Sequence, residues 1–163
     1  MIQLILVRHA PAGEPDPKRY PDDSARPLTQ TGIRKFKKAA EGMSKMVKPD
    51  AVLTSPTSRT MQTADLLHWD GGWPGFVADE ALLDDHTPKD VVKAIKGLAG
   101  KPSVIGLVGH GPALEQLAKH LTNQDVDLHK GGAAMIEMPS RTIKKGSGSV
   151  KWAMRRKELK KLR

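Results

Sequence analysis

The stretch Leu4–Gly13, LILVRHAPAG, places an arginine and a histidine directly after a run of aliphatic residues. The run is short, apolar and not alternating, which is typical of a strand covered on both faces of a parallel sheet. Such a strand normally gives way to a polar turn, but this one ends in a cation and an imidazole, Arg8 and His9. Ligands of open α/β sheets bind beyond the carboxyl ends of the strands, so this pair marks a candidate site.

The composition bounds the class of protein. A length of 163 residues suits a single domain over residues 1–163. The absence of cysteine excludes disulfides, thiolate metal sites and a cysteine nucleophile. The formal net charge of +9 favours an anionic partner, and much of the excess lies in Ile33–Lys48 and in residues 151–163. The basic tail, residues 155–163, is expected to be flexible. Aromatic residues make up only 4% of the chain, which disfavours stacking on nucleic acid.

The sequence carries no signal for a membrane or for export. No apolar stretch approaches the ~20 residues of a membrane span. The first apolar run lacks the basic region and the small-residue cleavage site of a signal peptide. We therefore expect a soluble cytoplasmic protein with no membrane partner.

Strand-like and helix-like segments alternate along the chain. The predicted strands are Ile2–Val7, Ala51–Thr54, Gly75–Ala78, Val104–Val108, Ala133–Met138 and Ser149–Met154. The predicted helices cover residues 30–47 after the N-cap Thr29, 59–68 after Ser58, 88–98 after Thr87, and a segment opened by Pro112. This alternation predicts an α/β fold with a parallel sheet. The last two strands are joined by a loop rich in Pro, Gly and Ser, so they are expected to form an antiparallel edge.

Polar residues suited to phosphoryl chemistry follow the other predicted strands. They are Thr54–Pro56 and Arg59 after the second strand, Asp79–Glu80 and Asp84–Asp85 after the third, and Gly109–Pro112 after the fourth. Arginines are forked donors for phosphoryl oxygens, and helix N-termini attract anions. A neutral imidazole can attack phosphorus, a second one can stabilise the transferring group, and a carboxylic acid can protonate the leaving atom. Because arginines would repel a cation, the set favours chemistry without a metal.

Three motifs in this order give the sequence a family resemblance. LVRHA (6–10), LTSPTSRTMQTA (53–64) and GLVGHGP (106–112) resemble the histidine phosphatase superfamily, the phosphoglycerate mutase-like group. RPLTQTG (26–32), GGAAMIEM (131–138) and SVKWAMRRKEL (149–159) resemble its small SixA-type phosphohistidine phosphatase branch. The resemblance covers nearly the whole chain. It implies a three-layer α/β/α phosphoglycerate mutase-like fold with a mostly parallel sheet and an antiparallel edge.

The resemblance implies roles for four residues. His9 matches the nucleophile that forms a phosphohistidine intermediate, and His110 matches the second catalytic histidine, which also binds phosphate. Arg8 and Arg59 match the two phosphate clamps. The family pocket uses no metal and no cofactor. The neighbouring arginines are expected to depress the pKa of His9 toward its neutral, nucleophilic form.

The general acid is less sharply marked. The stretch DEALLDD (79–85) places Asp84 at the position of the family's acid, with Asp85 and Glu80 as alternatives. Phosphohistidine needs less help from an acid than an ester does, because a protonatable imidazole is a better leaving group than an alkoxide.

Two further positions bear on the pocket. Arg26 is either a phosphate-binding residue at the pocket mouth or a surface arginine paired with Asp22 or Asp23. Ala10 stands where the commonest family pattern has glycine, and its methyl group is interpreted as tolerated.

The spacing of the motifs bears on the substrate. Few residues separate Arg59 from Asp84 and His110, which leaves little room for a lid and favours a phosphoryl group presented on a protein. The predicted function is therefore metal-independent removal of phosphate from protein phosphohistidine, with inorganic phosphate as product. The alternatives are a small-molecule phosphomonoester phosphatase, a mutase, and a noncatalytic binder of anionic partners through the basic surface. A binder would lose affinity with salt and keep it without His9, whereas an enzyme would lose turnover in His9→Ala.

Overall fold

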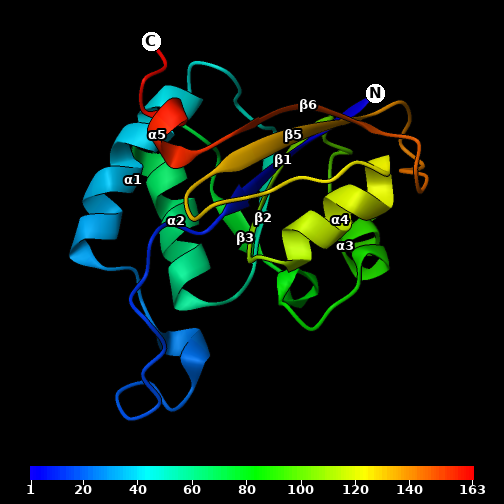
Figure 1. The fold of residues 1–163 in the computed structure, drawn as a ribbon. Helices are drawn as coiled ribbons and strands as arrows, with labels where there is room; N and C mark the ends of the chain where they lie inside the picture. The colour runs from blue at the N-terminus through cyan, green and yellow to red at the C-terminus, as the bar shows by residue number, and fades with distance from the viewer.

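The strand that begins the chain lies inside a six-stranded sheet, with a neighbour on each side. The computed structural model describes residues 1–163, and the strand order is β3-β2-β4-β1-β5-β6 (Figure 1). The strands are β1 (Ile2–Arg8), β2 (Ala51–Thr54), β3 (Phe76–Ala78), β4 (Val104–Gly109), β5 (Ala133–Met138) and β6 (Ser149–Met154). Strands β1 to β4 pair in parallel, whereas β5 is antiparallel to β1 and β6 is antiparallel to β5. The predicted α/β class, with a mostly parallel sheet and an antiparallel edge, is confirmed.

Helices cover both faces of the sheet. The helices are α1 (Gln30–Met43), α2 (Ser58–Trp69), α3 (Pro88–Lys96), α4 (Ala113–Thr122) and α5 (Arg156–Leu159), with short 3₁₀ turns η1 (Asp23–Ala25) and η2 (Glu80–Leu82). Figure 1 shows α1, α2 and α5 on one side of the sheet and α3 and α4 on the other. Leu4 and Leu6 of β1 pack into the core under α3 and α4, and Ile5 and Val7 into the core under α1 and α2. Burial on both faces explains why the apolar run does not alternate.

Several predicted boundaries are wrong in detail; helix α3, for example, ends at Lys96 and not at residue 98. Helix α1 ends at Met43 and not at Val47, because the N–H groups of Lys45 and Met46 bond to the carbonyls three residues back, those of Gly42 and Met43, in a tighter turn. Helix α2 is capped by Thr57 and not by Ser58, because Thr57 and Thr60 exchange side-chain and backbone hydrogen bonds in a capping box. The third strand begins at Phe76, one residue later than predicted.

Part of the basic tail forms a helix in the structure. The sequence leads us to expect a flexible segment over residues 155–163, whereas Arg156–Leu159 forms α5. The side chain of Leu159 is fully buried beside α1, and the backbone of Gly42 lies against the carbonyl group of Leu159. The close approach of the two helices requires a residue without a side chain at position 42.

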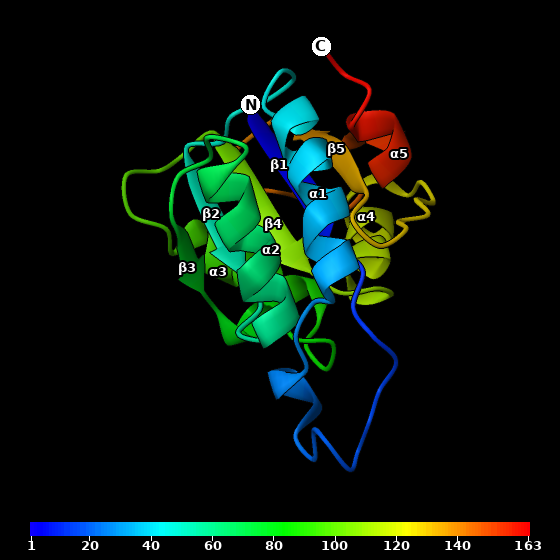
Figure 2. The ribbon, with the colours of Figure 1, turned by 90° about the vertical axis from the view of Figure 1, so that its left-hand side faces the viewer.

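The parallel strands bring the candidate residues to one edge. Arg8 is paired with Gly109 across β1 and β4, and Thr54 with Val108 across β2 and β4. The residues that follow these strands therefore start from the same edge of the sheet. At this end, the segment between β1 and α1 extends beyond the body of the fold (Figure 2). No helix of the structure has the length and apolarity needed to cross a membrane.

Gly42→Ala tests the packing of α5. In an isolated helix this change would stabilise the helix by up to about 1 kcal/mol. Here the added Cβ would overlap the carbonyl oxygen of Leu159, so we expect a net loss of about 1–3 kcal/mol in the free energy of unfolding. Denaturant unfolding measures it. Gly97→Ala is the control, because its Cβ would make only ordinary contacts, at 3.5 Å and 3.6 Å. Stabilisation by Gly42→Ala would contradict the packing of α5 on α1.

Candidate functional site

Two histidines that lie far apart in the sequence face each other at the carboxyl edge of the sheet. The ring centroids of His9 and His110 are 5.7 Å apart, and the ring planes meet at 63°. The two residues are 6% and 3% exposed, and Arg59 is 6% exposed. Arg8 is partly buried. The structure thus brings together the four residues that the motifs single out.

The imidazole of His9 is held in one tautomer. Its Nδ1 lies 2.7 Å from the carbonyl oxygen of Ala10. Because a carbonyl oxygen only accepts, Nδ1 carries the hydrogen and donates it, which leaves a lone pair on Nε2. Burial is the largest cause that lowers the pKa of His9 to about 4. The hydrogen bond to the carbonyl of Ala10 raises this pKa, whereas the charges of His110, Arg59 and Arg8 lower it further. The ring is therefore neutral at pH 7. The sequence-based expectation named the arginines as the cause, but desolvation is the largest one.

The backbone around His9 is fixed from three sides. The N–H of His9 donates to the carbonyl of Gly109 at 3.0 Å, and the N–H of Gly131 donates to the carbonyl of His9 at 2.9 Å. The N–H of Ala10 donates to Oγ1 of Thr63 at 3.0 Å, and this hydroxyl donates to the carbonyl of Arg59. Thr63 therefore connects the segment of the first histidine to the helix of the second arginine.

The methyl group of Ala10 is accommodated in the core. Ala10 is fully buried and belongs to the apolar cluster that the sheet forms with α1 and α2. The side chain that distinguishes this position from glycine packs among hydrophobic residues.

His110 contacts a hydroxyl group and a carboxylate. Its Nε2 lies 2.9 Å from Oγ of Ser55 and 3.7 Å from Oδ1 of Asp84. Burial lowers the pKa of His110, Asp84 opposes this shift, and Arg59 and Arg8 add to it. Ser55 is fully buried at the end of β2. The sequence placed Ser55 among the polar residues that follow the second strand, but its contact with His110 was not predicted.

Both arginines keep one N–H group free inside the protein. Nη1 of Arg8 donates to the carbonyl of Leu128 at 2.8 Å, and Nη1 of Arg59 donates to the carbonyl of Asp23 at 2.8 Å. The Nε atoms of both arginines are buried and have no hydrogen-bond partner. A buried unpaired donor is costly and rare in folded proteins, so two of them beside two histidines indicate a place for an anion. Oε1 of Glu115, an acceptor, is likewise buried and has no hydrogen-bond partner.

The glycine after His110 makes room for the first arginine. A Cβ on Gly111 would lie 3.0 Å from Cζ of Arg8 and 3.1 Å from Oε1 of Glu115. Any side chain at this position would push against the guanidinium group, which explains a glycine in the stretch GLVGHGP.

Asp23 connects two arginines at the rim. Its Oδ2 lies 3.1 Å from Nη2 of Arg59, and its Oδ1 accepts from Nε of Arg26 at 2.8 Å. Arg26 also donates to the carbonyl of Gly13. The ion pair between Arg26 and Asp23 was one of the two alternatives for Arg26, and the structure places this pair against Arg59. The sequence considered Asp23 only as a surface partner of Arg26 and missed its contact with Arg59.

The three candidate acids lie in different places. Asp84 is 61% exposed at the side chain and lies next to His110. Asp85 instead accepts from Nδ1 of His86 at 2.9 Å. Glu80 begins η2 and lines a different cavity, together with His86. Of the three, Asp84 contacts the histidine pair, and its role as acid stays a prediction.

Comparisons with known proteins agree with the motifs. The family model for the histidine phosphatase superfamily (branch 1) matches residues 4–82. The solved structure of the protein histidine phosphatase SixA complexed with tungstate is similar with a TM-score of 0.83 and 21% identity, over 97% of this chain and 99% of that chain. The putative phosphohistidine phosphatase SixA from Agrobacterium tumefaciens has a TM-score of 0.77 and 18% identity, over 94% and 97%. No curated protein sequence matches this chain.

A phosphatase that is named for a different substrate has a similar fold. A mycobacterial glucosyl-3-phosphoglycerate phosphatase complexed with VO3 has a TM-score of 0.66 and 15% identity, over 93% of this chain and 98% of that chain. At these identities the solved structures establish the fold, which is the phosphoglycerate mutase-like fold that the resemblance implies. The family model adds a sequence similarity to the histidine phosphatase superfamily over residues 4–82, a range that includes Arg8, His9 and Arg59.

Proposed function

We propose that this protein is a phosphatase that removes the phosphoryl group from phosphohistidine on a protein, through a covalent intermediate on His9. One observation carries the proposal: a neutral imidazole with a free Nε2 lies beside two arginines that each keep a buried, unpaired N–H group. A neutral nucleophile and unpaired donors are what an attack on a bound phosphoryl group requires. The match of residues 4–82 to the model of the histidine phosphatase superfamily supports the reaction class.

In the first step, Nε2 of His9 attacks phosphorus. A P–N bond to His9 forms as the bond to the leaving nitrogen breaks, and the leaving imidazole takes a proton, supplied by Asp84 or by water. Arg8, Arg59 and His110 hold the nonbridging oxygens. The phosphorylated ring of His9 becomes cationic, and its Nδ1–H group already donates to the carbonyl of Ala10, which stabilises that charge.

In the second step, water attacks phosphorus on His9. The P–Nε2 bond breaks, the lone pair returns to Nε2, and inorganic phosphate leaves. The proton that the water loses goes to Asp84 or to solvent, whichever supplied the proton in the first step. No metal or cofactor takes part in the proposed cycle, because the arginines and His110 neutralise the phosphoryl charge.

The rim of the site supports a protein substrate. Asp84, which contacts His110, and Asp23, which contacts Arg59, have side chains that are 61% and 51% exposed. A phosphoryl group on a protein surface can reach a site with such an open rim. A phosphoramidate also needs little help from an acid, which fits a single carboxylate at the solvent-exposed edge. The SixA structure with a similar fold is described as a protein histidine phosphatase.

His9→Ala tests the proposed nucleophile. We expect wild type to release phosphate from a phosphohistidine-bearing protein in the presence of EDTA, and His9→Ala to lose at least about a thousandfold in kcat/KM. His120→Ala is the matched control, because His120 lies in the last turn of α4, at the far end of the helix from His110. Equal rates for wild type and His9→Ala would rule out the covalent route.

The same assay separates the substrate classes. We expect a higher kcat/KM for the phosphohistidine protein than for phosphoserine or p-nitrophenyl phosphate. Preference for the small esters, with His9 still essential, would leave a small-molecule phosphatase of the same superfamily. If none of the three substrates releases phosphate, the protein is a noncatalytic binder.

The burial of His9 predicts how stability depends on pH. The unfolded chain binds a proton on this ring below its ordinary pKa near 6.5, whereas the folded protein binds it only below about 4. Stability therefore falls as pH falls between these values. We expect wild type to lose about 2 kcal/mol more than His9→Gln between pH 7 and about pH 4.5, measured by denaturant unfolding. Equal losses in the two proteins would show that His9 titrates normally.

Asp23→Asn tests the orientation of Arg59. Without the carboxylate, Arg59 and Arg26 lose the charge that separates them, so we expect kcat/KM to fall about tenfold, equivalent to about 1.4 kcal/mol. Asp22→Asn is the control, because Asp22 accepts only from Ser24, and an asparagine can still cap η1. Unchanged kinetics in Asp23→Asn would show that Arg59 is oriented without this carboxylate.

A further inference from the structure

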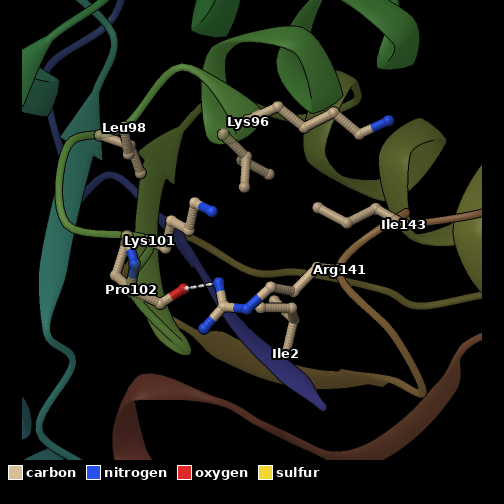
Figure 3. Close-up of a pocket in the computed structure, with 8 residues that line it drawn as sticks. Ile2, Lys96, Leu98, Lys101, Pro102, Arg141 and Ile143 are labelled. Carbon is tan, nitrogen blue, oxygen red and sulfur yellow. Dashed lines mark hydrogen bonds between the residues drawn. The ribbon is translucent and has the colours of Figure 1, made fainter.

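A second cavity lies at the opposite edge of the sheet from the histidine pair. It has a volume of about 230 Å³ and is found where β1 begins and β4 is about to start. Its apolar lining includes the buried side chains of Ile2, Ile95 and Ile143, which come from β1, α3 and the turn after β5. Figure 3 shows the side chains of Lys101 and Arg141 extending into the same space from two different segments.

The cations of this cavity have no acidic partner. Neither Lys101 nor Arg141 forms an ion pair, and no carboxylate lines the cavity. The guanidinium group of Arg141 is anchored by bonds to the carbonyl of Pro102 at 3.3 Å and to Oγ of Ser103 at 3.0 Å. Lys96 also lines the cavity, but its ammonium group points away from Lys101 and Arg141 (Figure 3). Like charges held together repel one another, and a bound anion would remove this repulsion.

Backbone strain is concentrated at the same cavity. Three residues other than glycine have a positive φ: Lys101 at 46°, Asn123 at 59° and Ile143 at 50°. Asn123 is explained, because it ends α4 as a left-handed C-cap. The other two line the cavity, and a β-branched residue such as Ile143 is especially unfavourable in this conformation. Glycine would avoid the strain at both positions, so we infer that the side chains of Lys101 and Ile143 make a favourable interaction that offsets the strain. Strained residues cluster at ligand sites.

We propose that this cavity binds a small amphipathic anion, a carboxylate on a short aliphatic chain. The chain would pack on the isoleucines, and the carboxylate would lie between Lys101 and Arg141. At about 30 Å³ for each water-sized group, the cavity takes about seven or eight methylene-sized groups. An eight-carbon carboxylate therefore has a suitable size. The proposal does not depend on the phosphatase function, because the cavity shares no lining residue with the histidine site.

The test uses octanoate as the probe, with octanol and octylammonium as the neutral and cationic controls. The methyl signals of the isoleucines are followed by NMR during titration. We expect saturable shifts for Ile2, Ile95 and Ile143 with octanoate, and none for Ile5 and Ile33, which belong to the core under α1 and α2. We expect the two controls to bind at least tenfold more weakly than octanoate.

Variants separate the charge from the apolar lining. We expect Arg141→Glu to weaken octanoate binding at least tenfold, whereas Lys35→Glu, the same change at an exposed position of α1, changes it less than twofold. Lys101→Gly removes a cation and relieves its positive φ. We expect it to weaken binding while the melting temperature stays equal or rises, so that lost binding is not lost folding.

Four outcomes would overturn the proposal. They are the absence of saturable shifts, shifts spread over all isoleucines, equal affinity for octanol or octylammonium, and unchanged affinity in Arg141→Glu.

Discussion

The burial of the His9 ring at the end of β1 is the constraint on which the rest of the site depends. A charged imidazole would be costly in this position, so the ring is neutral, and the bond from Nδ1 to the Ala10 carbonyl decides which nitrogen keeps the lone pair. The central place of β1 makes this geometry rigid, because its strand neighbours hold it on both sides. A histidine on an exposed loop would titrate near its ordinary pKa of about 6.5 and would have no fixed tautomer.

The same burial requires the surrounding charges to be balanced. Two arginines beside two histidines would repel one another in a desolvated edge. Asp23 takes up part of this charge at Arg59, and Asp84 does so at His110. Both carboxylates lie at the rim, where water still reaches them. The buried floor therefore stays positive toward an anion, while the site as a whole avoids a large uncompensated charge.

Most of the fold and the four central residues of the candidate site could be predicted from the sequence, for a physical reason. Strands buried on both faces appear as unbroken apolar runs, and polar residues directly after them must meet at one edge. Arg8, His9, Arg59 and His110 could therefore be found from local pattern and motif alone. The cap of α2 was misplaced because Thr57 and Ser58 are both suitable cap residues, and only the return bond from Thr60 decides between them.

The roles that were missed depend on tertiary contacts. Ser55 touches His110, Thr63 touches Ala10, and Asp23 touches Arg59, each across a separation of more than thirty positions. No local period or cap rule marks such pairs. The helix α5 belongs to the same class, because its four residues are too few to form a helix alone, and it is the contact of Leu159 with Gly42 that holds them.

In the two proposals, the two ends of β1 serve different sites, although only seven residues span the strand. Ile2 lines the apolar cavity with its cations, and Arg8 leads into the histidine pair. A ligand at one end could influence the other only by moving the strand. Each residue of β1 from Gln3 to Val7 has a partner on both β4 and β5, so such a movement would break two ladders at once. The strand is therefore a rigid spacer between two sites, and occupation of the cavity should leave the geometry of His9 unchanged.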